Sequence, residues 1–238
     1  MERVLGDRPA AYWPLMETQG LTAFDWKGGN HGAIQGGVTL GQPSAPGLPG
    51  TAMGFDGTTG YIQTPYVQEN VIAYTIEAWV RQTAAQGAST DKPLVADRGS
   101  AGSGLSITLG MPGYGSNQAG AVSIGVDSNG VFIGINSAAS YADAAWHHVM
   151  GTWQGAAGQA VTPAQFGLLV DAVAIATTTT TAGSATAPLA GSGGTQIAYS
   201  SAWGYSGVQM AHVAIYRYRL TLNQAQAHFF GRPRDLIS

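Results

Sequence analysis

Cysteine is absent from the 238-residue chain, which excludes disulfide bonds, thiolate metal sites and cysteine nucleophiles. Charged residues are also scarce, at 10% of the chain, where about a quarter is usual in globular proteins. The 10 Lys and Arg residues form no basic run, whereas nucleic-acid binding needs clustered basic side chains that neutralise phosphates. We therefore expect no nucleic-acid partner and a surface of neutral polar residues and glycine.

Long apolar runs are missing as well. No stretch approaches the roughly 18 apolar residues that a membrane span requires, so we expect no membrane insertion. Asp7, Arg8 and Pro9 interrupt the N-terminal segment, which lacks the apolar core of a secretory signal. The expectation is a protein made in the cytoplasm that reaches the outside of a cell only if it is released within a particle.

What the chain does contain is a series of short alternating segments between Gly-rich turns. In residues 74–82, Tyr74, Ile76, Ala78 and Val80 share one face, which is the period of a half-buried strand. Residues 121–126 and 131–135 flank the turn DSNG and predict a hairpin. Further strands are predicted at 94–98, 105–109, 166–176, 195–203 and 208–217. The fold class is therefore all-β, a two-sheet antiparallel jelly-roll sandwich.

One short C-terminal helix is predicted after this series. Thr221 and Gln224 form a T-x-x-Q capping box, and Gly231 ends the helix. Three segments are predicted as loops, at 84–92, 110–120 and 177–194. The last is of low complexity and is expected to be disordered, or ordered only against a partner.

The segment WHHVMGTW (146–153) places two histidines side by side, which raises the question of a metal site. In a strand, however, His147 and His148 point to opposite faces and cannot chelate one ion. The other histidines show no ligand spacing. We therefore predict a strand whose histidines have a packing role.

Seven motifs in a fixed order resemble the laminin-G-like, or concanavalin A-like, jelly-roll family. They are AYWPLME (11–17), AFDWKGGNHGAIQGGV (23–38), AMGFDGTTGYIQTP (52–65), YTIEAWVR (74–81), WHHVMGTW (146–153), LLVDAVAIA (168–176) and VAIYRYRLTLNQAQAHFFG (213–231). The resemblance implies a lectin-like domain at 10–231, an N-terminal arm at 1–9 and a C-terminal tail at 232–238. Members of the family mostly bind carbohydrate or protein, and a minority relative is a glycoside hydrolase.

The opening VLGDRPAAYWPL further resembles the start of such domains in bacteriophage tail and other virion proteins. This resemblance implies a protein of the virion, with other virion proteins as partners. Subunits of such particles are commonly symmetric, so a homo-oligomer is expected.

Aromatic side chains in or beside the predicted loops are the candidate glycan platform, because their apolar faces stack on sugar rings. These residues are Tyr66, Tyr114, Tyr141, Trp203 and Tyr205. The alternative for each of them is packing beneath its own loop. Trp13, Trp79 and Trp153 are assigned to the core or the inner sheet.

Calcium is the one cofactor that the resemblance suggests. Asp25 and Asn30 match the family's A-x-D-x-S-G-N loop, whose oxygens suit a hard cation. Members that hold calcium usually add carboxylates in a segment where this chain has Ala211 and His212. Asp25 alternatively only caps a turn. Where the family has a D-G hairpin the chain has Asp171 followed by Ala, which predicts a different turn type because Ala tolerates positive φ poorly.

No catalytic residue is expected. Glycosidases of the sandwich class place carboxyls on one strand as E-x-D-x-E, and this chain has only Glu77 in its central strand. Glu77 is therefore predicted to be a hydrogen-bonded structural carboxylate. Our leading hypothesis is a non-enzymatic, lectin-like surface protein of a bacteriophage that binds glycans or host-surface material. The alternatives are a capsid or tail decoration subunit and, more distantly, a glycoside hydrolase.

Overall fold

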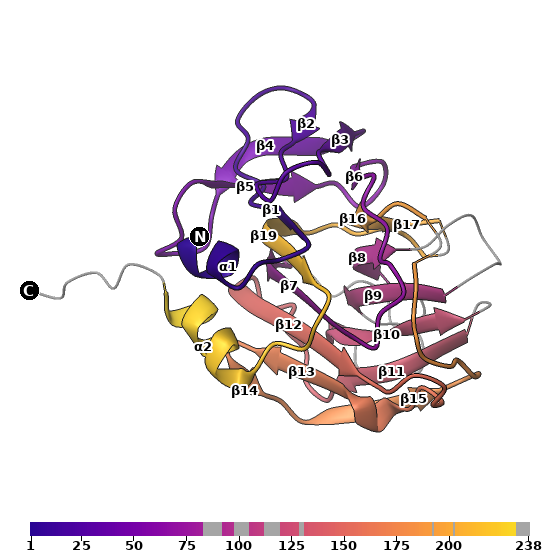
Figure 1. The fold of residues 1–238 in the computed structure, drawn as a ribbon. Coiled ribbons are helices and arrows are strands. Elements are labelled where there is room, and N and C mark those ends of the chain that lie inside the picture. Colours follow the sequence, from indigo (N-terminus) through magenta and orange to yellow (C-terminus); the bar gives the residue numbers. More distant parts are fainter. Residues whose placement is uncertain are drawn as a thin grey trace, which may run out of the picture.

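The computed structural model describes residues 1–82, 92–97, 105–111, 120–128, 131–191, 193–201 and 203–231. Within these residues the chain forms two stacked antiparallel sheets and two short helices that lie beside each other (Figure 1). Sheet A has the order β14-β13-β12-β7-β19-β5-β4, with β1 paired to β19, and sheet B has the order β15-β11-β10-β9-β8-β16-β6-β3-β2. The small hairpin β17-β18 completes the described strands. The predicted all-β jelly-roll sandwich is confirmed.

The strands of sheet A are β1 (Ala11–Trp13), β4 (Val38–Pro43), β5 (Thr51–Phe55), β7 (Ala73–Arg81), β12 (Trp146–Gln154), β13 (Phe166–Val170), β14 (Val173–Ala174) and β19 (Gln209–Tyr216). Those of sheet B are β2 (Thr22–Ala23), β3 (Gly32–Gln35), β6 (Tyr61–Gln63), β8 (Lys92–Asp97), β9 (Leu105–Met111), β10 (Ser123–Ser128), β11 (Val131–Ser137), β15 (Thr177–Thr181) and β16 (Gln196–Ile197). The remaining elements are α1 (Glu2–Gly6), η1 (Pro163–Gln165), β17 (Tyr199–Ser200), β18 (Gly204–Tyr205) and α2 (Leu222–Phe230).

The hydrophobic core lies between the two sheets and follows the predicted alternation. Tyr74, Ile76, Ala78 and Val80 of β7 are buried in it, together with apolar residues of β12, β13, β10 and β11. The fully buried Trp13 and Trp153 also belong to it. Complete burial of an aromatic side chain removes a large apolar area from water, so these rings hold the sheets together.

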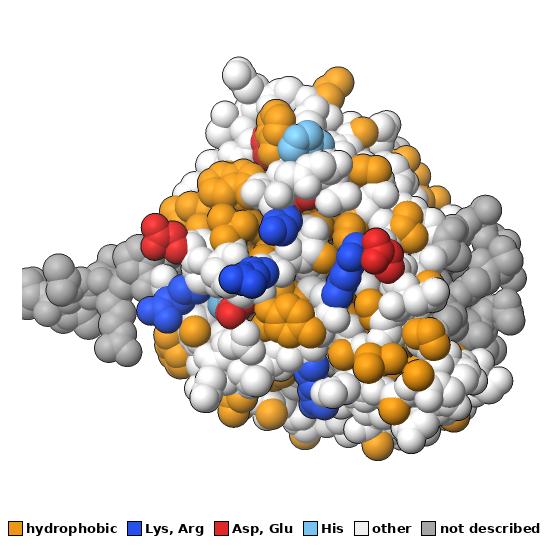
Figure 2. All heavy atoms as spheres, viewed as in Figure 1, with side chains coloured by type: hydrophobic (Ala, Val, Ile, Leu, Met, Phe, Trp, Pro, Cys, Tyr) orange, Lys and Arg blue, Asp and Glu red, His pale blue; other side chains and the backbone are white. Residues whose placement is uncertain are grey.

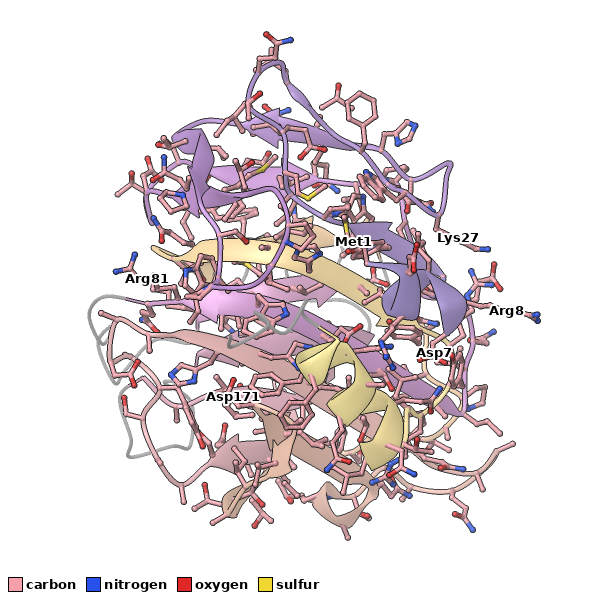
Figure 3. All side chains as sticks on the ribbon, turned by 90° about the vertical axis from the view of Figure 1, so that its left-hand side faces the viewer. Met1, Asp7, Arg8, Lys27, Arg81 and Asp171 are labelled. Carbon is pink, nitrogen blue, oxygen red and sulfur yellow. The ribbon has the colours of Figure 1, made fainter. Side chains whose placement is uncertain are left out.

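The outer face of sheet A is covered at its centre by α2 (Figure 3). Trp79 is buried on this face, with its ring stacked on Phe229 of α2 at 5.6 Å, so it belongs to a second cluster outside the inter-sheet core. The capping box predicted for α2 is present, because the Thr221 hydroxyl accepts from the Gln224 N–H and the Gln224 side chain accepts from Thr221 N–H. α1 lies beside α2, and Gln224 Nε2 donates to Asp7 Oδ1 at 2.8 Å, so the predicted N-terminal arm packs on the domain.

WHHVMGTW forms β12, which pairs with β7 along its full length, so the predicted strand is confirmed. The predicted 121–135 hairpin is also confirmed, by the β10–β11 pairing. The prediction of a loop at 177–194 is partly wrong. Thr177–Thr181 forms β15 and pairs with β11, because a run of β-branched threonines favours extended backbone. Of the other two predicted loops, residues 83–91 and 112–119 lie outside the described residues.

The turn between β13 and β14 corrects another prediction. Asp171 and Ala172 have φ values of 51° and 62°, so both keep the positive φ of a type I′ turn although neither is glycine. The Asp171 carboxylate accepts from His147 Nδ1 at 2.8 Å and from His148 N–H at 2.9 Å. These bonds hold the turn in a conformation that Ala by itself disfavours.

Within the described part of the chain, no helix is long and apolar enough to cross a membrane.

Candidate functional site

One end of the sandwich, which we call the rim, gathers strand ends from both sheets. In sheet A, Arg81 at the end of β7 pairs with Trp146 of β12 and Gln209 of β19. In sheet B, Lys92 at the start of β8 pairs with Met111 at the end of β9. Residues 205–209 run from the separate β17–β18 hairpin directly into β19 of sheet A at this end.

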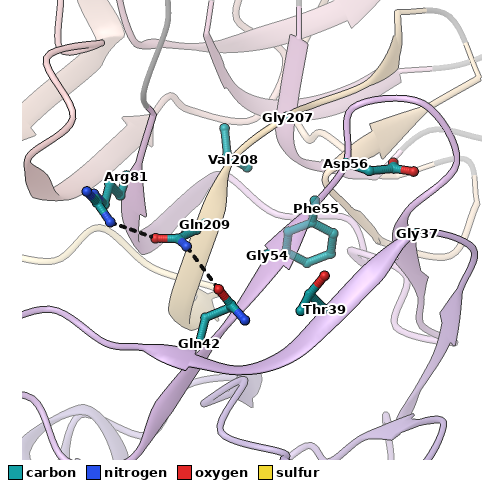
Figure 4. A pocket seen from close by; sticks show the side chains of 10 residues that line it. All are labelled: Gly37, Thr39, Gln42, Gly54, Phe55, Asp56, Arg81, Gly207, Val208 and Gln209. Carbon is teal, nitrogen blue, oxygen red and sulfur yellow. Dashed lines mark hydrogen bonds between the residues drawn. The ribbon is translucent and has the colours of Figure 1, made fainter.

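A shallow pocket of about 250 Å³ opens at the rim (Figure 4). It is lined by Gly37, Thr39, Gln42, Gly54, Phe55, Asp56, Arg81, Gly207, Val208 and Gln209. The Arg81 guanidinium donates from Nε to the Ala144 carbonyl at 2.7 Å and from Nη1 to Gln209 Oε1 at 3.3 Å. Gln209 Nε2 in turn lies 3.4 Å from Gln42 Oε1. The guanidinium and two amides therefore form a row of oriented hydrogen-bonding groups along one wall.

Asp56, the one acidic residue lining this pocket, is committed to its own turn. Its Oδ1 accepts from the backbone N–H groups of Thr58, Thr59 and Gly60, each at 2.8 Å. Hydrogen bonds from Thr59 and Thr58 hold the pKa of Asp56 well below its usual range. The carboxylate is thus a charged turn cap, and a second carboxyl that glycoside hydrolysis requires is missing from the pocket lining.

Three tyrosine rings cluster beside the segment that leads to the pocket. The ring centroids of Tyr199 and Tyr205 are 4.4 Å apart, and Tyr61 lies 4.9 Å and 6.0 Å from them. All three side chains are half-buried, so part of each ring faces solvent. Trp203, also half-buried, lies in the turn of the same hairpin. Such rings offer the apolar faces on which sugars stack.

Of the five predicted glycan residues, Trp203 and Tyr205 lie in this arrangement. Tyr141 also lies at the rim, where its N–H donates to Gly120 O and its half-buried ring packs edge-on against His147 at 5.2 Å. Tyr114 lies outside the described residues.

Tyr66 corrects the prediction, because it is only 4% exposed. Its hydroxyl donates to Gln68 Oε1 at 2.9 Å, and its ring packs against Trp13 in the core. Tyr66 thus follows the packing alternative that was open for each aromatic. Tyr66 lies in a short connection directly after a core strand. From the sequence alone, a tyrosine in such a connection can be either exposed or packed into the core.

Sequence reasoning missed Arg81, Tyr61 and Tyr199. Arg81 was not among the candidates, and its position at the end of a predicted strand was the available signal. Tyr61 and Tyr199 come together through the pairing of β6 with β16, in which Ile62 lies opposite Ile197. That pairing joins segments more than a hundred residues apart, so local patterns could not reveal it.

The candidate calcium residues Asp25 and Asn30 do not fit a cation site in this arrangement. Asp25 Oδ1 accepts from Tyr12 N–H and Lys27 N–H, both at 2.9 Å. Asp25 Oδ2 accepts from the backbone N–H of Asn30 at 3.2 Å and from its Nδ2 at 2.9 Å. Both oxygens of this buried carboxylate are therefore used in capping the turn, which is the alternative the sequence left open. Among the residues described, no three His, Asp or Glu side chains are grouped to hold a metal ion.

Glu77 lies at the centre of a buried network beneath α2. Its Oε2 accepts from His148 Nε2 and His228 Nδ1, both at 3.0 Å, and its Oε1 accepts from the Tyr216 hydroxyl at 2.6 Å. Burial alone would raise the pKa of Glu77, but the hydrogen bonds from the two histidines outweigh it and hold the pKa well below its usual range. Glu77 is 1% exposed, so it is the structural carboxylate that was predicted.

His228 has a carboxylate at each ring nitrogen. Nδ1 faces Glu77, and Nε2 lies 2.8 Å from Asp7 Oδ2. Because carboxylates accept hydrogen bonds, both nitrogens must donate and the ring is an imidazolium. Burial lowers the pKa of His228, but the bonds to Glu77 and Asp7 prevail and raise it overall. The charged ring fastens α2 and the N-terminal segment to sheet A.

Comparisons with known proteins agree with this architecture. The binding domain of Paraclostridial Mosquitocidal Protein 1 superposes with a TM-score of 0.64 at 11% identity, over 94% of this chain and 52% of that chain. The binding domain of botulinum neurotoxin DC in complex with SialylT gives 0.63 at 13% identity, over 97% and 53%. A Trypanosoma rangeli sialidase in complex with 2,3-difluorosialic acid gives 0.55 at 16% identity, over 97% and 34%.

At these identities the structural matches establish the fold alone, and the chain spans about half the length of the two binding-domain chains. No curated protein sequence matches the chain significantly. The family model described as the concanavalin A-like lectin/glucanases superfamily, however, matches residues 56–226. The chain therefore belongs to the concanavalin A-like lectin/glucanase superfamily.

Proposed function

We propose that the chain is a non-enzymatic carbohydrate-binding protein that holds glycans at the rim. The observation that carries the proposal is that one short segment, residues 205–209, carries both Tyr205 of the tyrosine cluster and Gln209 of the Arg81–Gln209–Gln42 wall. Guanidinium and amide groups suit sugar hydroxyls, and the neighbouring rings suit the apolar face of a pyranose. The complex of a structurally similar binding domain with SialylT supports glycans as the ligand class.

The absence of catalysis is part of the same proposal. The pocket lining contains a single carboxylate, Asp56, which caps a turn. Glu77 is buried beneath α2 and carries three hydrogen bonds, so it is out of reach of a substrate. A glycosidase needs two carboxyls about 5–9.5 Å apart across the scissile bond.

The test is a screen of the purified chain against a glycan array, followed by titration of the best glycan with variants. Tyr205→Ala and Arg81→Gln are each expected to weaken binding about tenfold, which corresponds to about 1.4 kcal/mol. The control is Arg217→Gln, because Arg217 lies beyond the other end of β19 and pairs with Glu69 on the surface. Far-UV circular dichroism checks that each variant is folded. Wild-type affinity in both rim variants would contradict the proposal.

We further propose that the protein is displayed on a bacteriophage virion, on the strength of the N-terminal resemblance. Neighbouring genes for portal, capsid or tape-measure proteins would support this setting, and metabolic neighbours would oppose it. The alternative role, a decoration subunit bound to other virion proteins or to copies of itself, has one structural observation in its favour. Large apolar side chains remain exposed, including Leu21 at 75%, Phe230 at 57% and Phe24 at 50%.

Figure 2 shows hydrophobic side chains gathered among a few Lys and Arg residues on the face that carries α1. Burial of such residues in an assembly would remove apolar area from water. Sedimentation of the chain alone separates the roles, since a decoration subunit that closes on itself would sediment as an oligomer, whereas a monomer that binds glycan favours the first proposal.

A further inference from the structure

A second pocket, of about 350 Å³, lies on the outer face of sheet A at the start of α2. It is lined by Thr152, Gln154, Gly167, Leu168, Leu169, Ala174, Arg219, Leu220, Thr221 and Leu222. Thr152 pairs with Thr75 of β7, six residues from Arg81, so at the strand rise of about 3.3 Å per residue the pocket is about 20 Å from the rim. The two pockets are therefore separate sites on one sheet.

Arg219 is the single charged residue of this lining, and no carboxylate accompanies it. Its neighbour on the same segment, Arg217, pairs with Glu69 at 2.9 Å, but Arg219 makes no ion pair with any residue that the structure describes. The guanidinium lies over Gly167, where a Cβ would come within 3.1 Å of Nη2 and 2.8 Å of Thr152 Oγ1. The glycine thus leaves room for the hollow and for the guanidinium above it.

The remaining lining is strongly apolar for a surface pocket. The side chains of Leu169 and the buried Leu220 form its floor, and Leu222 at the first position of α2 is 48% exposed. The exposed Gln154 adds an amide from β12, whereas Thr152 is 1% exposed and its hydroxyl lies 3.5 Å from the Gly167 carbonyl oxygen. A guanidinium beside leucines and an exposed amide favours a ligand with one carboxylate, a small apolar substituent and hydroxyls.

We propose that this pocket is a subsite for an acidic N-acetylated sugar. The sugar carboxylate pairs with the Arg219 guanidinium, whose planar fork matches two carboxylate oxygens. The acetamido methyl lies against Leu169 and Leu222, and a hydroxyl of the sugar bonds to the Gln154 amide. The subsite extends the proposed glycan-binding function, but it is distinct from the rim and does not need the rim to be occupied.

The experiment is a titration of the full chain with N-acetylneuraminic acid, followed by ligand-observed NMR. Arg219→Gln is expected to weaken binding about tenfold or more, because the variant cannot form the charge-assisted bidentate pair with the sugar carboxylate. Arg217→Gln is the matched control and is expected to change the affinity less than twofold. The methyl ester of the sugar, which lacks the charge, should bind as poorly to the wild type as the acid binds to Arg219→Gln.

Leu222→Ser tests the apolar side independently, because this exposed leucine can be replaced without disturbing the core, and a loss of several fold is expected. Binding that depends on Arg81 and not on Arg219 would overturn the subsite while leaving the rim proposal in place. Binding of octanoate with the same Arg219 dependence, without binding of the sugar, would overturn the sugar as ligand. No binding of N-acetylneuraminic acid would overturn the subsite, whatever the glycan array shows for the rim.

Discussion

Replacement of Glu77 by Gln is expected to lower the free energy of unfolding by about 3 kcal/mol or more, the cost of removing one partner from a buried ionic network. The carboxylate is 1% exposed and accepts from His148, His228 and Tyr216. A glutamine keeps the volume, but its single carbonyl oxygen cannot accept three hydrogen bonds in the same geometry. Its amide group would also face a donor. The imidazolium of His228 would lose its most buried counter-charge.

Urea unfolding at pH 6 measures this loss. The matched control is Glu69→Gln, which removes an exposed carboxylate paired with Arg217 at 2.9 Å. Exposed pairs contribute little, so a change within about 0.5 kcal/mol is expected for the control. If Glu77→Gln matches the control, the network does not stabilise the fold.

The network also gives the protein a pH-dependent contribution to stability. The pKa of His228 is raised in the folded state, so its contribution is complete below the unfolded value of about 6.5 and is lost as the pH rises through the folded value. The contribution of His147 to stability is also lost as the pH rises, because hydrogen bonds to Asp171 and Asp143 raise its pKa. Both histidines therefore stabilise the fold more at low pH, His147 at the turn that contains Asp171 and His228 between α2 and the N-terminal segment.

The fold was predictable because its signals are local. The alternation in β7 and β12 fixed the faces of the central strands, and Thr221 with Gln224 fixed the start of α2. The role of Glu77 followed by elimination, since no second carboxyl accompanied it on its strand. The low complexity of Thr177–Thr181 led to the prediction of a loop, although its β-branched residues favour a strand. This strand forms by pairing with β11.

The site was predictable only in part, because it depends on contacts between distant segments. Tyr205 was a candidate from its loop position, but its neighbours Tyr61 and Tyr199 arrive through the pairing of β6 with β16. Tyr66 shows the converse, since the same residue type in a similar context is buried by Trp13 and Gln68. The positive φ of Ala172 likewise depends on a remote contact, from His147 and His148 to the preceding aspartate.

Asp97 is a second buried carboxylate, but its surroundings raise its pKa, whereas those of Glu77 lower it. It is 3% exposed at the end of β8, and its Oδ2 accepts from Gln68 N–H at 2.5 Å. Among the residues that the structure describes, its Oδ1 has no hydrogen-bond partner. Burial raises the pKa of Asp97 to about 7, against the lowering effect of the N–H groups of Gln68 and Gly193. The folded protein therefore retains a proton that the unfolded chain releases near pH 4.

The Asp97→Asn variant is expected to be more stable than the wild type by about 2 kcal/mol or more at pH 8, and about equal to it at pH 4. Between the unfolded pKa near 4 and the folded value of about 7, the folded wild type binds more protons, so its stability falls as the pH rises. Asparagine cannot ionise, and its carbonyl oxygen can still accept from Gln68 N–H.

Urea unfolding of wild type and variant from pH 4 to pH 8 tests this expectation, and the difference between the two curves removes the histidine contributions they share. Asp56→Asn serves as the control of opposite sign. Hydrogen bonds from Thr59 and Thr58 lower the pKa of Asp56, so that variant should lose stability above pH 4 and approach the wild type as the pH falls below it. A difference curve for Asp97→Asn that is flat, or that falls with pH, would show that the buried carboxylate is ionised in the folded protein and paired there.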